Sequence, residues 1–177
     1  MGLFGGNKEE AGATLPVSDA ERWIAGTYAV WSEYCGGSYR YLGGYEKTKS
    51  NAKMIARVLR QDWMIKDHDS GVEMVEYLLK NAGPENIAFD YACACNMCGR
   101  MFIAGYFTRE ESIRYAAMAA EQIQRLYSSW EEYFQAYIEG AAGGSNVKER
   151  EPFEAAYLQF KNAADSPLLL NWNTALR

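Results

Sequence analysis

Histidine is nearly absent from this 177-residue sequence, and its scarcity limits the catalytic arrangements that the chain can form. The single histidine, His68, lies in the polar stretch Lys66–Asp69, with no serine or cysteine at a recognised spacing from it. A catalytic triad of nucleophile, histidine and acid is therefore not expected. No glycine-rich loop follows a strand-like run, which argues against phosphate-binding loops of the Walker and Rossmann kinds.

Basic residues are outnumbered, with 18 lysines and arginines against 23 acidic residues, a formal net charge of −5 and a pI near 5.0. The sequence shows no run of Lys and Arg and no basic face with interleaved aromatic residues. Binding to nucleic acid requires cations that neutralise phosphates, so no nucleic-acid partner is predicted. An acidic balance of this size mainly favours solubility.

The N-terminal stretch MGLFGGNKEEAGATLP lacks both the basic n-region and the long apolar h-region of a secretory signal. A myristoylation signal is not predicted either, because it needs Ser or Thr where Gly6 stands. Residues 1–16 therefore read as a flexible tail before a single helical domain spanning 17–177. The four cysteines indicate reduced thiols in a cytoplasmic protein rather than a secreted disulfide framework.

Long apolar runs free of polar groups are missing as well. The most apolar stretch, from Ile87 to Phe107, has roughly the 20 residues that a membrane span needs. Asp90, Asn96 and Arg100 lie within it, and placing such groups in lipid is costly. We therefore predict no membrane partner for this chain.

Apolar residues recur at three- and four-residue steps through most of the chain, and no stretch reads as a strand. Several helix starts are marked by a capping pattern, a Ser or Thr three residues before a Glu. The sequence thus predicts an all-α, single-domain helical bundle of about six to seven helices around a buried central helix, residues 84–107. The closing segment SPLLLNWNTALR is expected to dock its Leu and Trp side chains on this bundle. The helices are expected over Ser18–Cys35, from about Ser50, over Ser70–Gly83, 84–107, Thr108–Ser128 and Ser129–Gly140, and from about Pro152.

Asp90 is an acid on the apolar stripe of the predicted central helix, where a carboxylate must be ion-paired, hydrogen-bonded or neutral. One interpretation makes it a general acid or base in an enzyme or small-ligand pocket, with Asn96 and Tyr106 nearby in sequence. The other makes it a structural acid, paired with an arginine or hydrogen-bonded to a Trp or Tyr. The structural interpretation is favoured, since no second catalytic group stands in a known relation to Asp90. The candidate arginines are Arg57, Arg60 and Arg114.

Three cysteines stand close together as Cys93-x-Cys95-x-x-Cys98, a spacing that looks like a metal or redox motif when read as a string. On a helix, residues two apart point about 200° apart, so Cys93 and Cys95 cannot face one metal. Cys95 and Cys98 share a face and can form a thiol pair, or bind a metal together with distant ligands. Close packing of small, buried side chains is the favoured interpretation, and we expect no metal and no cofactor.

Aromatic residues make up 14% of the chain, including 13 tyrosines and five tryptophans. This excess fits either a core rich in large rings or an exposed aromatic surface. Because no catalytic constellation accompanies it, the leading hypothesis is a non-catalytic binding or interaction protein, whose partner is another protein or a small ligand. The aromatic surface or groove is expected near Tyr39, Tyr41, Trp130 and Trp172.

The C-terminal half contains an ordered set of short motifs, namely Phe89-Asp90, Gly105-Tyr106, Ser129-Trp130-Glu131, Gly140 and a closing strip with Trp172 and Leu176. Their order and spacing resemble the bacterial domain-of-unknown-function family numbered 1266. The resemblance implies a helical, cytoplasmic, bacterial protein and brings no established activity. In the family pattern an Arg often follows the Asp by three residues, where this chain has Cys93, so Asp90 must be satisfied in another way.

Overall fold

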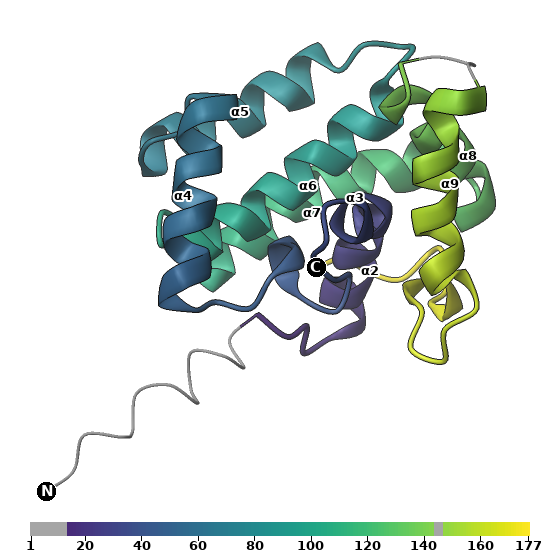
Figure 1. Cartoon of the computed structure of the whole chain (residues 1–177), viewed down its shortest axis with the longest axis horizontal. Coiled ribbons are helices and arrows are strands. Elements are labelled where there is room, and N and C mark those ends of the chain that lie inside the picture. The colour runs from purple at the N-terminus through teal and green to yellow at the C-terminus, as the bar shows by residue number, and fades with distance from the viewer. Residues whose placement is uncertain (1–13, 144–146) are drawn as a thin grey trace, which may run out of the picture.

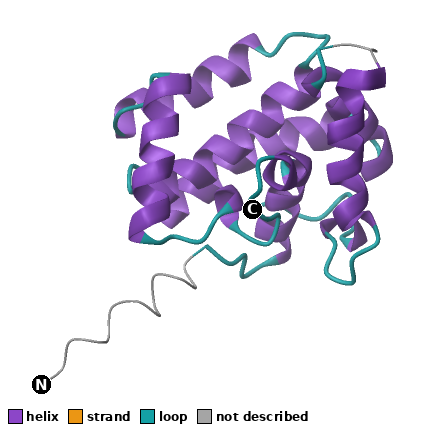
Figure 2. Cartoon of the chain, viewed as in Figure 1, coloured by secondary structure: helices purple, strands orange, loops and turns teal. Residues whose placement is uncertain are grey.

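The computed structural model describes residues 14–143 and 147–177, and all regular structure within these ranges is helical (Figure 1, Figure 2). The predicted all-α bundle is thereby confirmed. Eight α-helices lie in the described ranges, more than predicted because the first predicted helix is broken in two. They are α2 (Asp19–Thr27), α3 (Ala29–Tyr34), α4 (Lys49–Trp63), α5 (His68–Asn81), α6 (Ile87–Ala104), α7 (Arg109–Leu126), α8 (Trp130–Ala141) and α9 (Val147–Lys161), with short 3₁₀ helices η1 (Leu42–Gly44) and η2 (Pro167–Leu169).

Helix α6 occupies the centre of the bundle, as predicted, with 13 of its 18 residues buried. It contacts α2, α4, α5, α7, α8 and η1, and Figure 1 shows α4 and α5 on one side of the molecule and α8 and α9 on the other. The helix is shorter than the predicted 84–107, because residues 84–86 form a turn and Gly105 ends the helix at a left-handed φ of 83°. No helix within the described ranges is long and apolar enough to cross a membrane.

The first predicted helix is interrupted at Tyr28, which separates α2 from α3. Thr27 causes part of the break, since its hydroxyl donates to the Ile24 carbonyl at 2.7 Å, a contact that often bends helices. The Thr27 carbonyl in turn accepts the Tyr133 hydroxyl of α8 at 2.7 Å. The hydroxyl of Tyr133 therefore occupies the Thr27 carbonyl, which in a continuous helix would accept a backbone N–H of the next turn.

The start of α7 forms the predicted capping box. Thr108 Oγ1 accepts the Glu111 N–H at 3.2 Å, and the Glu111 carboxylate accepts the Thr108 N–H at 2.9 Å. Ser129 Oγ likewise accepts the Glu132 N–H at the start of α8. The predicted restart of the chain between these two helices is therefore confirmed.

Two predicted helix starts are wrong. The α5 helix begins at His68 rather than Ser70, because Asp67 is the N-cap and Ser70 is its reciprocal partner. The α9 helix begins at Val147, so Pro152 lies inside it and not in its first turn. A proline there removes one intrahelical hydrogen bond, yet the helix continues beyond it.

Segments at both ends of the described chain pack on the bundle. Thr14 is fully buried, and its carbonyl accepts the Leu42 N–H at 2.7 Å, so Thr14 is not part of a flexible tail as the 1–16 boundary predicted. The rest of that prediction falls mainly on residues 1–13, which lie outside the described ranges. Trp172 docks as predicted, since its indole N–H donates to the Tyr127 carbonyl at 2.9 Å.

Candidate functional site

Asp90, the candidate catalytic acid, lies in the first turn of α6 and is only half-buried. Its Oδ2 accepts the backbone N–H of Gly83 at 3.0 Å, which ties the preceding turn to the helix. Within the described ranges, no arginine lies at ion-pair distance from Asp90. The backbone therefore satisfies the acid, in place of the predicted arginine or aromatic partner.

The two residues expected beside Asp90 do not join it. Asn96 is buried further along α6, with 4% of its surface exposed, and its Nδ2 has no hydrogen-bond partner. Tyr106 lies beyond the C-terminal end of α6, which is itself about 21 Å along the helix axis from Asp90, and is half-buried against the core. The three residues therefore do not line one pocket.

The predicted aromatic groove is not an exposed surface. Trp130 and Trp172 are 7% and 8% exposed, and their rings lie 4.7 Å and 5.1 Å from that of the buried Trp23. Tyr39 is also buried, and only Tyr41 is half-exposed. The aromatic excess thus belongs mainly to the core, which corrects the placement of Trp130 and Trp172 on a binding surface.

Cys95 and Cys98 lie in the interior of the bundle. Cys95 Sγ donates to the Ala116 carbonyl of α7 at 3.4 Å, and Cys98 is fully buried. Burial raises the pKa of the Cys95 thiol to about 12 and that of Cys98 well above its usual range. Both residues are therefore neutral thiols in tight packing, and the described ranges contain no group of three or more metal-ligating side chains.

Two of the hollows on the described surface each contain a charged pair formed within the chain. In the first, of about 420 Å³, the Asp165 carboxylate accepts Arg40 Nε and the Tyr39 hydroxyl, both at 2.6 Å. The second, of about 850 Å³, contains an ion pair of Arg109 with Glu21 at 2.7 Å. These charged groups are therefore satisfied within the chain and do not themselves require a ligand.

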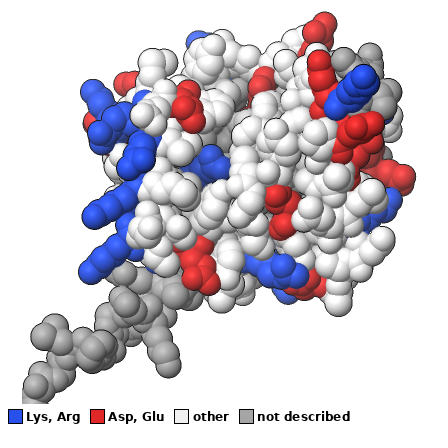
Figure 3. Space-filling view, viewed as in Figure 1, with Lys and Arg blue, Asp and Glu red and all other residues white. Residues whose placement is uncertain are grey.

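Helix α4 carries four exposed cations on one face, and we call this set the basic stripe. The cations recur at steps of four, four and three residues, which places them on neighbouring turns of the same side. Figure 3 shows positive charge gathered along the edge of the molecule formed by α4. Among the ion pairs of the described ranges, none involves these residues. The basic stripe consists of Lys49, Lys53, Arg57 and Arg60.

The inner face of α4 holds the basic stripe in place. Ile55 and Leu59 are almost completely buried, and α4 packs on α6. Thr48 caps the first turn by accepting the Asn51 N–H at 3.1 Å. At the other end Met64 adopts a left-handed conformation with φ 57°, which ends the helix. The four cations therefore lie on a helix whose position is fixed by its packing on α6 and by its two caps.

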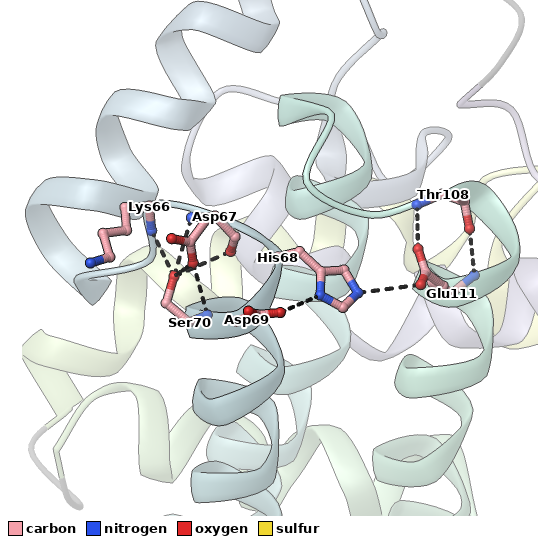
Figure 4. Close-up of polar contacts among 7 residues, drawn as sticks. All are labelled: Lys66, Asp67, His68, Asp69, Ser70, Thr108 and Glu111. Atoms are coloured by element: carbon pink, nitrogen blue, oxygen red, sulfur yellow. Dashed lines mark hydrogen bonds and ion pairs between the residues drawn. The ribbon is translucent and has the colours of Figure 1, made fainter.

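His68, the first residue of α5, connects the start of this helix to the start of α7 (Figure 4). Its Nδ1 lies 2.9 Å from Asp69 Oδ1, and its Nε2 lies 3.3 Å from Glu111 Oε1 at the start of α7. The hydrogen bond with Asp69, and next that with Glu111, raises the pKa of the His68 imidazole. The backbone N–H of Thr108 lowers the pKa of Glu111, so both changes favour a charged His68–Glu111 pair.

Sequence reasoning missed the basic stripe, although its signal is present. Positions 53, 57 and 60 have helical spacing within the helix predicted from about Ser50, and Lys49 lies one residue before that start. The cations are separated by apolar and small residues, so a search for a continuous Lys and Arg run, or for interleaved aromatic rings, does not detect them. The expectation of no basic face with interleaved aromatic residues therefore did not cover this stripe, which has no aromatic residue between its cations.

Comparison with protein-family models matches residues 80–173, more than half of the chain. This range begins near the end of α5, contains all of α6, α7, α8 and α9, and ends just beyond the docked Trp172. Helix α4 and its basic stripe precede it. Neither the curated proteins nor the solved structures gave a match. The matched family is described as Protein of unknown function (DUF1266), and the chain belongs to it.

Proposed function

We propose that this protein is a non-catalytic interaction protein whose basic stripe binds an acidic helical segment of a partner protein. One observation carries the proposal: four exposed cations lie on one face of α4 and form no ion pair with any other described residue, in a chain of net charge −5. Charge of one sign on a fixed surface accelerates encounter with a partner of opposite sign and selects against partners of like charge.

The spacing of the basic stripe suits a helical partner. From Lys49 to Arg60 the helix rises about 16 Å, so the cations are spread over roughly three turns. Glutamates at four-residue steps on a second helix repeat with a similar period and can each approach one cation. Met54 on α4 and Met64 at its C-cap, 40% and 78% exposed, can supply apolar contact area.

Two other anionic partners fit the geometry less well. Duplex DNA offers phosphates across both sides of a groove, whereas the cations here follow a single helix face. An amphipathic helix binds a membrane by burying its apolar face among the lipids. The apolar face of α4, with Ile55 and Leu59, is already buried within the bundle.

The alternative, an enzyme or small-ligand pocket centred on Asp90, takes second place. The Asp90 carboxylate already accepts the Gly83 N–H. Asn96 and Tyr106, the groups expected to assist Asp90, lie elsewhere on or beyond α6. Cys93 lies one turn after Asp90, but burial, and next the Asp90 charge, raise the pKa of its thiol to about 12, so it is not an activated nucleophile. The geometry therefore gives this alternative little support.

The test is the binding of a fluorescent, synthetic acidic helical peptide with glutamates at four-residue steps, measured by anisotropy at low and moderate salt. We expect saturable binding that weakens as salt screens the exposed charges. The double variant Lys53→Glu/Arg57→Glu should bind at least about tenfold more weakly, because two of the four attractions become repulsions. Circular dichroism will verify that the variant is folded.

A matched control changes the same number of charges elsewhere. Lys80→Glu/Arg125→Glu alters two exposed cations, on α5 and α7, that lie outside the basic stripe. This control should keep the wild-type affinity within about twofold, as expected for distant, screened charges. Equal losses in both double variants would show a net-charge effect and reject the basic stripe as the site. Preferential binding of duplex DNA or of phosphatidylserine vesicles would reject a protein partner.

A further inference from the structure

Arg100 on α6 is a buried cation without a carboxylate partner. Only 7% of the surface of Arg100 is exposed, and its Nε has no hydrogen-bond partner. Within the described ranges, no Asp or Glu lies at ion-pair distance from its guanidinium. A guanidinium cannot shed its proton in a protein, so the cost of burying this charge must be met by nearby acceptors or by a counter-charge.

Other unpaired polar groups lie in the same part of the interior. Asn96 stands one turn before Arg100 on the same side of α6, and its Nδ2 is buried without a partner. Ser32 Oγ of α3 and the Tyr137 hydroxyl of α8 are also buried without partners. Ser32 is placed near Arg100 by the η1 loop, since a Cβ added to Gly44 would lie 2.9 Å from Ser32 Oγ and one added to Gly43 would lie 2.7 Å from Arg100 N. Burial raises the pKa of Tyr137, and the Arg100 charge offsets part of this rise, which places the two side chains within electrostatic reach. All four groups can donate a hydrogen bond.

A glycine-rich loop covers this cluster and reaches the surface. Gly43 packs directly on the α6 backbone, since a Cβ added to Gly99 would lie 2.3 Å from Gly43 N. The loop continues to Tyr45, whose hydroxyl donates to the Cys35 carbonyl at 3.0 Å. Cys35 is exposed, and the Arg100 guanidinium offsets part of the rise that burial causes in the pKa of its thiol. Arg100 therefore extends from the interior to a position beside an exposed residue.

We propose that Arg100, Asn96, Ser32 and Tyr137 form a binding site for a small oxyanion, such as a phosphate or a carboxylate group, which reaches Arg100 beside Cys35. An oxyanion supplies both the missing counter-charge and acceptor oxygens for donors that the chain leaves unpaired. The planar guanidinium matches the geometry of either group, and charge-assisted hydrogen bonds of this kind are the strong ones. This site is separate from the basic stripe and does not depend on it.

The experiment titrates the full chain with inorganic phosphate, and in a second arm with acetate, at constant ionic strength maintained with chloride. Calorimetry gives the affinity, and ¹H–¹⁵N spectra tuned to arginine Nε report on Arg100 directly. We expect one saturable site and a shift of the Arg100 Nε–H resonance larger than that of any exposed arginine. The two arms distinguish a phosphoryl group from a carboxylate as the preferred ligand, and saturable binding in either supports the site.

Variants separate this site from surface charge. Arg100→Gln should lower the affinity at least tenfold, whereas Arg57→Gln, which removes an exposed cation of the basic stripe, should leave it within twofold. Asn96→Ala removes a buried, unpaired amide, so it should fold and still weaken the titration. If Arg100→Gln does not fold, the proposal is tested by the shift of the wild-type Arg100 resonance and by the affinity of Asn96→Ala. No saturable shift of the Arg100 resonance in either arm, or unchanged affinity in Asn96→Ala, would overturn the proposal.

Discussion

His68 is the residue whose charge state links two helix starts. Its ring lies between Asp69 on α5 and Glu111 on α7, and the carboxylates raise its pKa above the ordinary value of 6.5. A group whose pKa is raised by folding contributes its full stabilisation below the unfolded pKa and loses it as pH rises through the folded pKa. The pKa of Glu111 is lowered, so its carboxylate stays charged as the pH falls below the ordinary glutamate pKa of 4.5. The contact should therefore be strongest between about pH 5 and 6.5.

We predict that His68→Gln reduces the melting temperature more at pH 6 than at pH 8.5. The chain has one histidine, so a single imidazole NMR titration reports on His68 and should give a pKa above 6.5. Asp69→Asn is the control, because it removes the neighbouring carboxylate and leaves Glu111 in place, and it should lower this pKa. A pH-independent difference between wild type and His68→Gln would contradict a charged contact.

Asp90 illustrates how much the type of a residue can predict about its contacts. Its position on an apolar stripe correctly indicated that it needs a partner, but residue identity could not indicate that the partner is a backbone N–H of Gly83. That contact depends on how the chain turns before α6, which no side-chain pattern specifies. Trp130 and Trp172 illustrate the same point, because an indole ring serves equally well in a core and on a binding surface.

At the scale of elements, α6 and the η1 loop are in backbone contact at Gly99 and Gly43. A Cβ added to Gly99 would lie 2.3 Å from Gly43 N and 2.7 Å from its Cα, so Gly99→Ala must push two backbones apart. We predict a destabilisation of about 1–3 kcal/mol or more, the usual cost of overpacking, measured by urea unfolding.

Gly71→Ala is the matched comparison, because Gly71 is also a buried helical glycine. Its added Cβ would meet the Sδ of Met101 at 2.3 Å, a flexible side chain that can move aside. Alanine also favours the helix over glycine by about 1 kcal/mol, which offsets part of the cost of that movement. We expect Gly71→Ala to be the milder variant, and equal losses at both positions would contradict a rigid contact between α6 and η1.

The elements that the sequence predicted well are those defined by local chemistry. The Thr108–Glu111 box and the Ser129 cap lie where the pattern placed them, since capping groups act within one turn. The break at Tyr28 could not be predicted in this way, because it depends on a hydroxyl from Tyr133, far along the chain. The basic stripe was within reach of the sequence and required only that the cations be placed on the predicted helix.

Across the whole molecule, the buried apolar residues form one continuous cluster that includes Trp23 near one end of the described chain and Trp172 near the other. Trp172 contacts the rings of Trp23 and Trp130, and the Gln124 side-chain amide donates to its carbonyl at 2.7 Å. The closing segment thus connects α2, α7 and α8. From this arrangement we expect residues 17–177, which the sequence predicts to be a single domain, to unfold together.

We predict that Trp172→Ala destabilises the fold by about 3–5 kcal/mol, the usual cost of removing a buried large ring. Leu169→Ala, in the same segment but 70% exposed, should change stability by no more than about 0.5 kcal/mol. Urea unfolding of both variants should give one transition with coincident circular dichroism and tryptophan fluorescence curves, because the ring cluster and the helices share one core. If Trp172→Ala instead changes the fluorescence curve and leaves most helical signal at its original midpoint, the closing segment is an independent unit. The proposed single domain would then be restricted to the helices that retain the original midpoint.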